Sequence, residues 1–171
     1  LYAIAEHLVA TGVTTSAQLA LHGHRNGYGA FSRHPLLGIS FNAYQALWRL
    51  AGVDHMHVHG LGGKFAQQDA EVVASARACL TPLAGVDDRV LPAFSSGQWA
   101  GTVPQTHAAA RTTDLLFMAG GGIMAHPGGP AAGVASIRNA WEAVAAGEDL
   151  TAAARHDEPL AEALNFFGAL A

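Results

Sequence analysis

The sequence predicts an α/β fold built on a parallel β-sheet. Extended and helical segments alternate along the 171 residues, and strands that are separated by helices pair in parallel through right-handed crossovers. Half of the residues are hydrophobic and only 13% are charged, against about 25% in an average soluble domain. This composition excludes a disordered chain and suits strands that are covered on both faces. We therefore expect one domain with four βα units and additional C-terminal helices.

The first half of the chain contains two of these units. Residues 2–11 have helical spacing, and the short run 18–22 is the first expected strand. A helix is expected over 40–52, because Ser40 is a preferred N-cap residue and Gly52 a preferred helix terminator. Residues 54–60 then form the second expected strand, and residues 67–80 the helix that follows it.

The second half repeats the pattern. Strands are expected at 90–96 and, as a buried strand, at 114–120, with a short helix over 103–112 between them. We expect the glycine-rich segment 120–130 to break the chain and a long helix to start at Pro130, where proline is tolerated. Residues 148–171 have the spacing of two more helices.

The charge of the chain and the length of its apolar runs exclude several classes of protein. The net charge is −4 and the basic residues are dispersed, so we expect no nucleic-acid partner. No apolar run is long enough for a membrane span, and Glu6 and His7 interrupt the apolar start that a signal peptide would need. The single cysteine, Cys79, is expected to be a small buried apolar residue of a cytoplasmic protein.

The chain also begins inside a helical pattern and without Met. A complete eight-unit α/β barrel needs about 250 residues. We therefore expect the chain to be a piece of a longer protein.

The residues with chemical potential follow the expected strands. In parallel α/β folds, active sites form at the carboxyl ends of the strands. The sequence places there His22, His24 and Arg25, then His55, His57 and His59 on one strand face, then Ser96 and Gly97, and finally Gly120, Gly121 and Gly122 with His126 beyond.

Each of these groups has more than one interpretation. The alternating histidines are structural side chains, catalytic groups or zinc ligands, although no metal-binding helix motif or carboxylate partner accompanies them. The three glycines form either a tight turn or a cradle whose backbone amides hold an anion. Lys64 is the only lysine beside eight arginines and follows the glycine-rich residues 60–63; it is either a solvated loop residue or part of a lid over an anionic intermediate.

Four segments together resemble one known family. HGHR, GVDHMHVHGLGGK, VLPAFSSG and LLFMAGGGIMAHPGGPAAGVASIRNAWEA are similar, in order and spacing, to the C-terminal barrel half of the ribulose-bisphosphate carboxylase large subunit. The resemblance covers nearly the whole chain. It implies that residues 1–171 are the C-terminal half of a TIM (β/α)8 barrel, with the N-terminal domain and the first barrel strands absent.

The resemblance also implies residue roles. His24 would lie beside the reacting carbons, Arg25 and His57 would hold one phosphate, Lys64 would be the lid lysine, and His24 or His59 would supply a proton. Ser96 would contact a sugar hydroxyl next to Gly97 and Gln98, and the amides of Gly120 and Gly121 would bind a second anionic group. It further implies Mg²⁺ held by residues upstream of Leu1, a homodimer in the full-length protein, and an inactive fragment when those parts are missing.

Departures from the carbon-fixing pattern narrow the expected activity. Lys64 is followed by residues 65–68 of sequence FAQQ instead of Leu-Glu-Gly-Glu, Gln98 replaces a second glycine, Tyr28 replaces a histidine and His59 replaces a glycine. The chain therefore resembles the non-carbon-fixing branch, whose members decarboxylate, enolise or isomerise phosphorylated sugars through a metal-stabilised enediolate. Within that branch it is most similar to decarboxylases of a 3-oxo sugar-acid phosphate, the 3-oxo-isoapionate 4-phosphate type.

Three alternatives remain open. The first is a genuine ribulose-bisphosphate carboxylase. The second is a zinc-dependent barrel hydrolase in which His22 and His24 are paired ligands, although an arginine directly after the pair argues against it. The third is a phosphate-binding fragment without catalysis.

Overall fold

The computed structural model describes residues 20–25, 27–32, 36, 38–63, 67–83, 85 and 87–169. The expected helix 2–11, the start of the first expected strand and Lys64 lie outside the described residues. Within the described ranges, every helix is too short or too polar to span a membrane.

The described strands form a four-stranded sheet in the order β1-β2-β3-β4. They are β1 (His22–Gly23), β2 (His55–His59), β3 (Leu91–Ser95) and β4 (Leu116–Met118). β1 pairs in parallel with β2, with His22 opposite His55, and β3 pairs in parallel with β4, with Phe94 opposite Phe117. The predicted parallel α/β fold is therefore confirmed.

The chain divides into two compact units. Unit 1 comprises residues 1–57 and 75–92, and unit 2 comprises residues 58–74 and 93–171.

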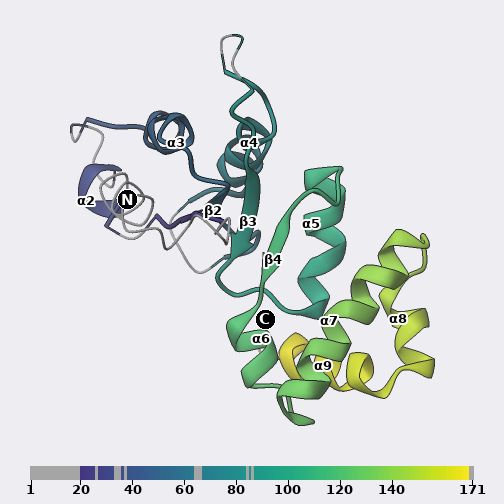
Figure 1. Ribbon diagram of the computed structural model, residues 1–171. Coiled ribbons are helices and arrows are strands. Elements are labelled where there is room, and N and C mark those ends of the chain that lie inside the picture. The colour runs from purple at the N-terminus through teal and green to yellow at the C-terminus, as the bar shows by residue number, and fades with distance from the viewer. Residues whose placement is uncertain are drawn as a thin grey trace, which may run out of the picture. The chain divides into compact units, whose positions relative to one another are not determined.

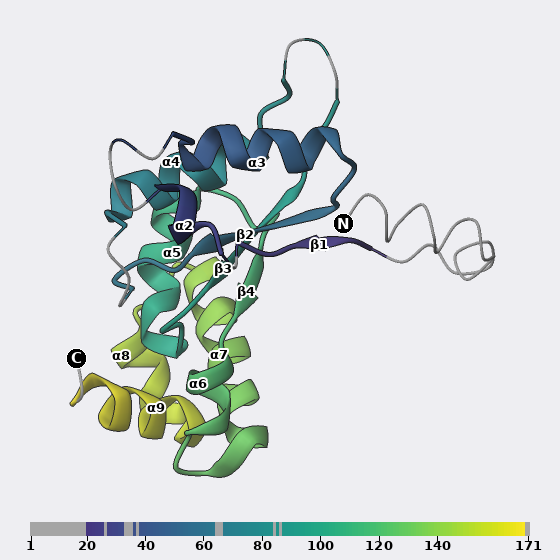
Figure 2. The same cartoon turned by 90° about the vertical axis from the view of Figure 1, so that its left-hand side faces the viewer.

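In unit 1, the local signals around Ser40 and Gly52 produce the expected helix. α3 (Phe41–Leu50) begins after Ser40, whose Oγ accepts a hydrogen bond from the Ala43 amide at 3.3 Å, and Gly52 follows it with a φ of 89°. The part of α4 (Asp69–Cys79) that belongs to unit 1 lies beside α3, as Figure 2 shows, and Gln45 Nε2 donates to the Ser75 carbonyl at 3.0 Å. A further short helix, α2 (Gly29–Ser32), precedes α3.

A buried ion pair lies beneath α3 in unit 1. The guanidinium of Arg49 is 2.9 Å from the carboxylate of Asp88, and the two side chains are only 2% and 4% exposed. Arg49 also donates to the carbonyls of Ala78, Thr81 and Asp88. Cys79 at the end of α4 is fully buried, and burial raises the pKa of its thiol to about 12. The expectation that Cys79 is a buried apolar residue is confirmed.

Unit 2 is a helical assembly around α7 (Gly129–Ala145). α7 packs against α5 (Val103–Ala110), α6 (Gly120–Met124) and α9 (Glu158–Gly168), as Figure 1 shows in green to yellow. The 3-10 helix η1 (Ala100–Thr102) precedes α5, while α8 (Leu150–Ala153) and η2 (Ala154–His156) connect α7 to α9. The core consists of small and aliphatic residues: Ala100, Val103, Ala140, Ala143, Leu150, Leu160 and Ala163.

The expected long helix and C-terminal helices are found in unit 2. Pro130 lies in the first turn of α7, as predicted. Asp149 and Asp157 cap α8 and α9 through hydrogen bonds to backbone amides.

Two expectations in this unit are corrected. The strand expected at 114–120 is only Leu116–Met118 and is half-buried, with Met118 43% exposed; β4 pairs with β3 on one side and is the last strand of the described sheet. The glycine-rich segment does not break the chain at once, because α6 begins at Gly120. Gly122 in α6 permits close packing against the loop after β3, since a Cβ on Gly122 would lie 2.5 Å from the Gln98 carbonyl oxygen.

Candidate functional site

Four imidazole rings gather at the β1–β2 pair of unit 1. The ring of His57 lies 4.4 Å from that of His24 and 6.0 Å from that of His22, and His22 lies 5.9 Å from His55, measured between centroids. The parallel pairing of β1 with β2 produces this arrangement, because it puts the alternating histidines of both strands side by side. The structure thus brings together two of the predicted site residues, His24 and His57.

Arg25 follows His24 directly and lies against aromatic rings. Its guanidinium carbon is 4.0 Å from the centroid of Phe41 and 5.2 Å from that of Tyr28. Partial burial lowers the pKa of Arg25 to about 10, while Tyr28 and Tyr44 oppose this shift. The guanidinium therefore stays charged at neutral pH but has lost part of its hydration, which favours the binding of an anion.

The aromatic partners of Arg25 were not predicted from the sequence. Tyr28 was noted only as a departure from the family pattern, yet it is buried, and its hydroxyl is 3.4 Å from the Ile39 carbonyl. Its ring also meets Phe41 and Tyr44 at 5.0 and 5.2 Å. The spacing of Phe41, Tyr44 and Trp48 along one face of α3 was the available signal.

His22 differs from a solvated imidazole. Burial lowers its pKa below the usual 6.5, and the nearby His55 and His24 lower it further. Its Nε2 is buried with no hydrogen-bond partner in the structure. Because this pKa lies below 6.5, His22 is predominantly neutral at pH 7.

The part of the chain that the structure describes contains no set of side chains arranged as metal ligands. No group of three or more His, Cys, Asp or Glu side chains there is arranged to hold a metal ion. The described imidazoles therefore give the zinc alternative no support, and neither zinc nor Mg²⁺ is assigned to them.

In unit 2, the loops that follow β2 and β3 contain the next group of predicted residues. The Gly60 amide donates to the carbonyl of Ser95, which joins the start of the loop after β2 to the last residue of β3. Ser96 has a φ of 72° and Gly97 a φ of 74°. The left-handed region is strained for a serine, and such strain gathers at functional sites.

Gln98 does not point into open space. Its side chain is buried, its Nε2 is 3.0 Å from the Ser96 carbonyl and 3.4 Å from that of Leu61, and its Oε1 accepts from Thr102 Oγ1 at 3.2 Å. The sequence had placed Gln98 in a substrate loop but gave no indication of these partners.

The structure describes three of the four other predicted residues of unit 2. His59 is half-buried at the end of β2. Gly120 and Gly121 are exposed in the first turn of α6, and a Cβ on either would meet nothing within 4 Å. Lys64 lies outside the described residues. The predicted roles of these residues stay predictions.

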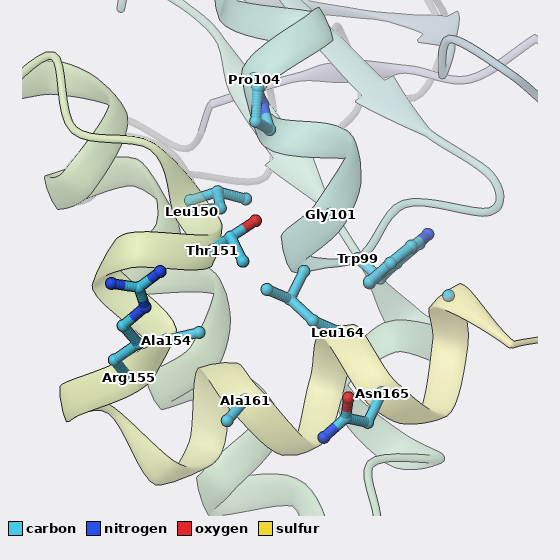
Figure 3. Close-up of a pocket in the computed structure, with 11 residues that line it drawn as sticks. Trp99, Gly101, Pro104, Leu150, Thr151, Ala154, Arg155, Ala161, Leu164 and Asn165 are labelled. Atoms are coloured by element: carbon cyan, nitrogen blue, oxygen red, sulfur yellow. The ribbon is translucent and has the colours of Figure 1, made fainter.

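A separate pocket lies among the helices of unit 2. Figure 3 shows it between η1, α8 and α9, with Trp99, Leu150, Arg155, Leu164 and Asn165 among its lining residues. Its volume is about 550 Å³. None of the predicted site residues lines it, so it is distinct from the groups described above.

Comparisons with known proteins agree with the sequence resemblance. The family model of the ribulose bisphosphate carboxylase large chain, catalytic domain, matches residues 8–167. An uncharacterized ribulose bisphosphate carboxylase-like protein of Bordetella bronchiseptica is 51% identical over 86% of this chain. A 3-oxo-isoapionate-4-phosphate decarboxylase of Rhizobium etli is 43% identical over 88% of this chain.

Solved structures give the same result. A rubisco-like protein from Burkholderia fungorum is 70% identical, covers 86% of this chain and superimposes with a TM-score of 0.82. The chain spans 36% of the length of both relatives named above and 37% of this solved chain.

Proposed function

Because the chain belongs to the family of the ribulose bisphosphate carboxylase large chain, catalytic domain, we propose that it forms part of an enzyme acting on a phosphorylated 3-oxo sugar acid. The proposed reaction removes the carboxyl group as carbon dioxide. The similarity to the Rhizobium etli decarboxylase supports this choice of substrate and reaction.

One observation supports the proposal most directly: directly after β1, Arg25 follows His24, whose ring contacts that of His57, and the Arg25 guanidinium packs on Phe41 and Tyr28. A charged, partly dehydrated guanidinium is suited to a phosphate group, which accepts hydrogen bonds from two of its nitrogens at once. His57 lies next to His24 and would share the phosphate with Arg25. We therefore assign the phosphate of the substrate to this part of unit 1.

His24 is the proposed proton-transfer group. Its ring is exposed and contacts that of His57 at 4.4 Å, so it can meet a bound ligand. Loss of carbon dioxide from a 3-oxo acid leaves an enolate, whose carbon must then take up a proton. An imidazole can donate that proton near neutral pH.

Ser96 would contact a sugar hydroxyl, and the amides of Gly120 and Gly121 would face the carboxylate end of the substrate. Lys64 would neutralise charge that develops there. His59 is the alternative proton donor. These roles follow the family resemblance, and the strained backbone of Ser96 supports its part.

Mg²⁺ and a homodimeric assembly belong to the same proposal. When bound, Mg²⁺ would stabilise negative charge on the substrate oxygens, with ligands outside the described residues. An archaeal family member from Hyperthermus butylicus with 32% identity is described as dimeric, which supports the proposed dimer. Removal of Mg²⁺ by EDTA should abolish turnover.

The test measures carbon dioxide release from a 3-oxo sugar-acid phosphate by the natural gene product that carries this sequence. Arg25→Ala should raise KM by about 100-fold with a smaller effect on kcat, because it removes a charged hydrogen bond to phosphate. His24→Ala and Lys64→Ala should each lower kcat by about 100-fold or more.

Arg138→Ala is the matched control. This arginine is 70% exposed on α7 and pairs only loosely with Glu142 at 3.8 Å, so its loss should leave both constants unchanged. An unchanged KM in Arg25→Ala, or carboxylation of ribulose bisphosphate in place of decarboxylation, would overturn the proposal.

A further inference from the structure

Gln98 holds the loops after β2 and β3 together from inside unit 2. Its side chain is only 2% exposed. The amide nitrogen donates to carbonyls on both sides, Ser96 in its own loop and Leu61 in the loop after β2. The amide oxygen accepts from Thr102, so both ends of the amide are engaged with the protein.

Gly60 is complementary to this amide. A Cβ on Gly60 would overlap Nε2 and Cδ of Gln98 and would lie 2.8 Å from the Ser95 carbonyl oxygen. Gly60 is not among the glycines with a positive φ, so its backbone conformation is open to any residue. The close approach of Gln98, together with that of the Ser95 carbonyl oxygen, therefore explains the glycine at position 60.

The loop after β2 is also held on its other side. The Gly62 amide donates to Asp69 Oδ1 in the first turn of α4 at 3.0 Å. Residues 60–63 are thus fixed between Gln98 and Asp69. The Gly60 amide also donates to the Ser95 carbonyl, so loss of the Gln98 contacts releases one of three attachments.

We infer that Gln98 is a positioning residue and not a substrate contact. It fixes the separation between the loop after β2 and the strained turn at Ser96, and it acts on the reaction only through these backbone segments. The part of this inference that concerns the reaction rests on the proposed function, in which Ser96 contacts the substrate. The mechanical part, that Gln98 and Gly60 interlock, stands independently of any activity.

The first experiment measures amide hydrogen exchange in the 171-residue chain. Gln98→Met keeps the side-chain volume but removes the hydrogen bonds, so the Gly60 and Gly62 amides should exchange about tenfold faster. Gln45→Met is the matched control, because Gln45 is also buried and donates to Ser75 in unit 1. It should leave both glycine amides unchanged, and equal exchange in the two variants would overturn the inference.

The second experiment is a double-mutant cycle on stability, which stays informative if a single variant unfolds. Gly60→Ala should be strongly destabilising in the native background and less so with Gln98→Gly, which removes the overlapping amide but leaves the contact with the Ser95 carbonyl oxygen. A folded double variant beside an unfolded Gly60→Ala variant supports the interlock. Additive effects of the two substitutions would refute it.

The third experiment separates positioning from substrate contact. Saturating inorganic phosphate or the sugar-acid phosphate should leave the side-chain amide NMR signal of Gln98 in place, whereas direct contact would shift it. In the natural gene product, Gln98→Met should lower kcat about tenfold with KM nearly unchanged, and Gln45→Met should change neither. If no sugar phosphate is turned over, the proposed function fails, while the exchange and stability results still decide the interlock.

Discussion

The buried pair of Arg49 and Asp88 should dominate the stability of unit 1. Replacing Arg49 with Leu leaves the Asp88 carboxylate buried without its cation, and it removes the donor to the carbonyls of Ala78 and Thr81. Breaking such a pair from one side costs about 3–5 kcal/mol. Since small domains unfold with about 5–15 kcal/mol, Arg49→Leu should lose a large part of the folding free energy.

Urea unfolding followed by circular dichroism measures this loss. The chain has a matched control in Arg89, which pairs with Asp87 at 2.7 Å, a distance similar to the 2.9 Å of the buried pair. The Arg89 and Asp87 side chains are 57% and 68% exposed, so Arg89→Leu should leave the urea midpoint unchanged.

A double variant tests the cause. The double variant Arg49→Met, Asp88→Asn removes both charges. In the native chain the Leu83 backbone amide donates to Asp88 Oδ1 at 2.7 Å, and the side-chain oxygen of asparagine can accept the same hydrogen bond. The double variant should recover part of the stability lost in Arg49→Leu. A loss below about 1 kcal/mol in Arg49→Leu, in the range of a surface pair, would refute the reasoning.

Three further predictions follow from burial and packing. Cys79, with a thiol pKa of about 12, should react with a thiol reagent only as fast as the chain unfolds, measured by absorbance at neutral pH. Because the pKa of His22 in the folded chain lies below the unfolded value of 6.5, protonation of His22 favours the unfolded chain as the pH falls through and below 6.5. The melting temperature of His22→Gln should therefore fall less than that of the native chain between about pH 7 and pH 5. Melting temperatures that fall in parallel with pH would contradict this. Gly133→Ala would place a Cβ 2.5 Å from the Ile123 carbonyl oxygen and should destabilise by about 1–3 kcal/mol in urea, whereas Gly168→Ala, with nothing within 4 Å, should not.

The sequence predicted those parts of the fold that depend on local signals. α3 starts and ends where Ser40 and Gly52 indicate, because capping hydrogen bonds and a left-handed glycine involve neighbouring residues only. The start of α6 was not predicted, since three glycines in a row disfavour a helix. There, Gly122 packs closely against the Gln98 carbonyl, and that contact joins residues far apart in sequence.

In the candidate site, too, features set by neighbouring residues were predictable and features set by long-range contacts were not. The period of two along a strand predicted which histidines share a strand face, and the parallel pairing of β1 with β2 then brings His24 and His57 together. The direction of the Gln98 side chain was not predictable. Its direction depends on Gly60, 38 positions earlier, which has no Cβ and so leaves room for the Gln98 amide. Local sequence patterns do not indicate such a long-range contact.

The left-handed backbone at Ser96 has a consequence for protein engineering. Glycine adopts a φ of 72° without strain, while a serine there costs about 1 kcal/mol or more. The residue that would give the most stable chain at position 96 is therefore different from the residue that supplies a hydroxyl. A thermostability screen of this protein would select glycine at position 96, and the variant it recovered would have exchanged the proposed substrate contact for a higher melting temperature.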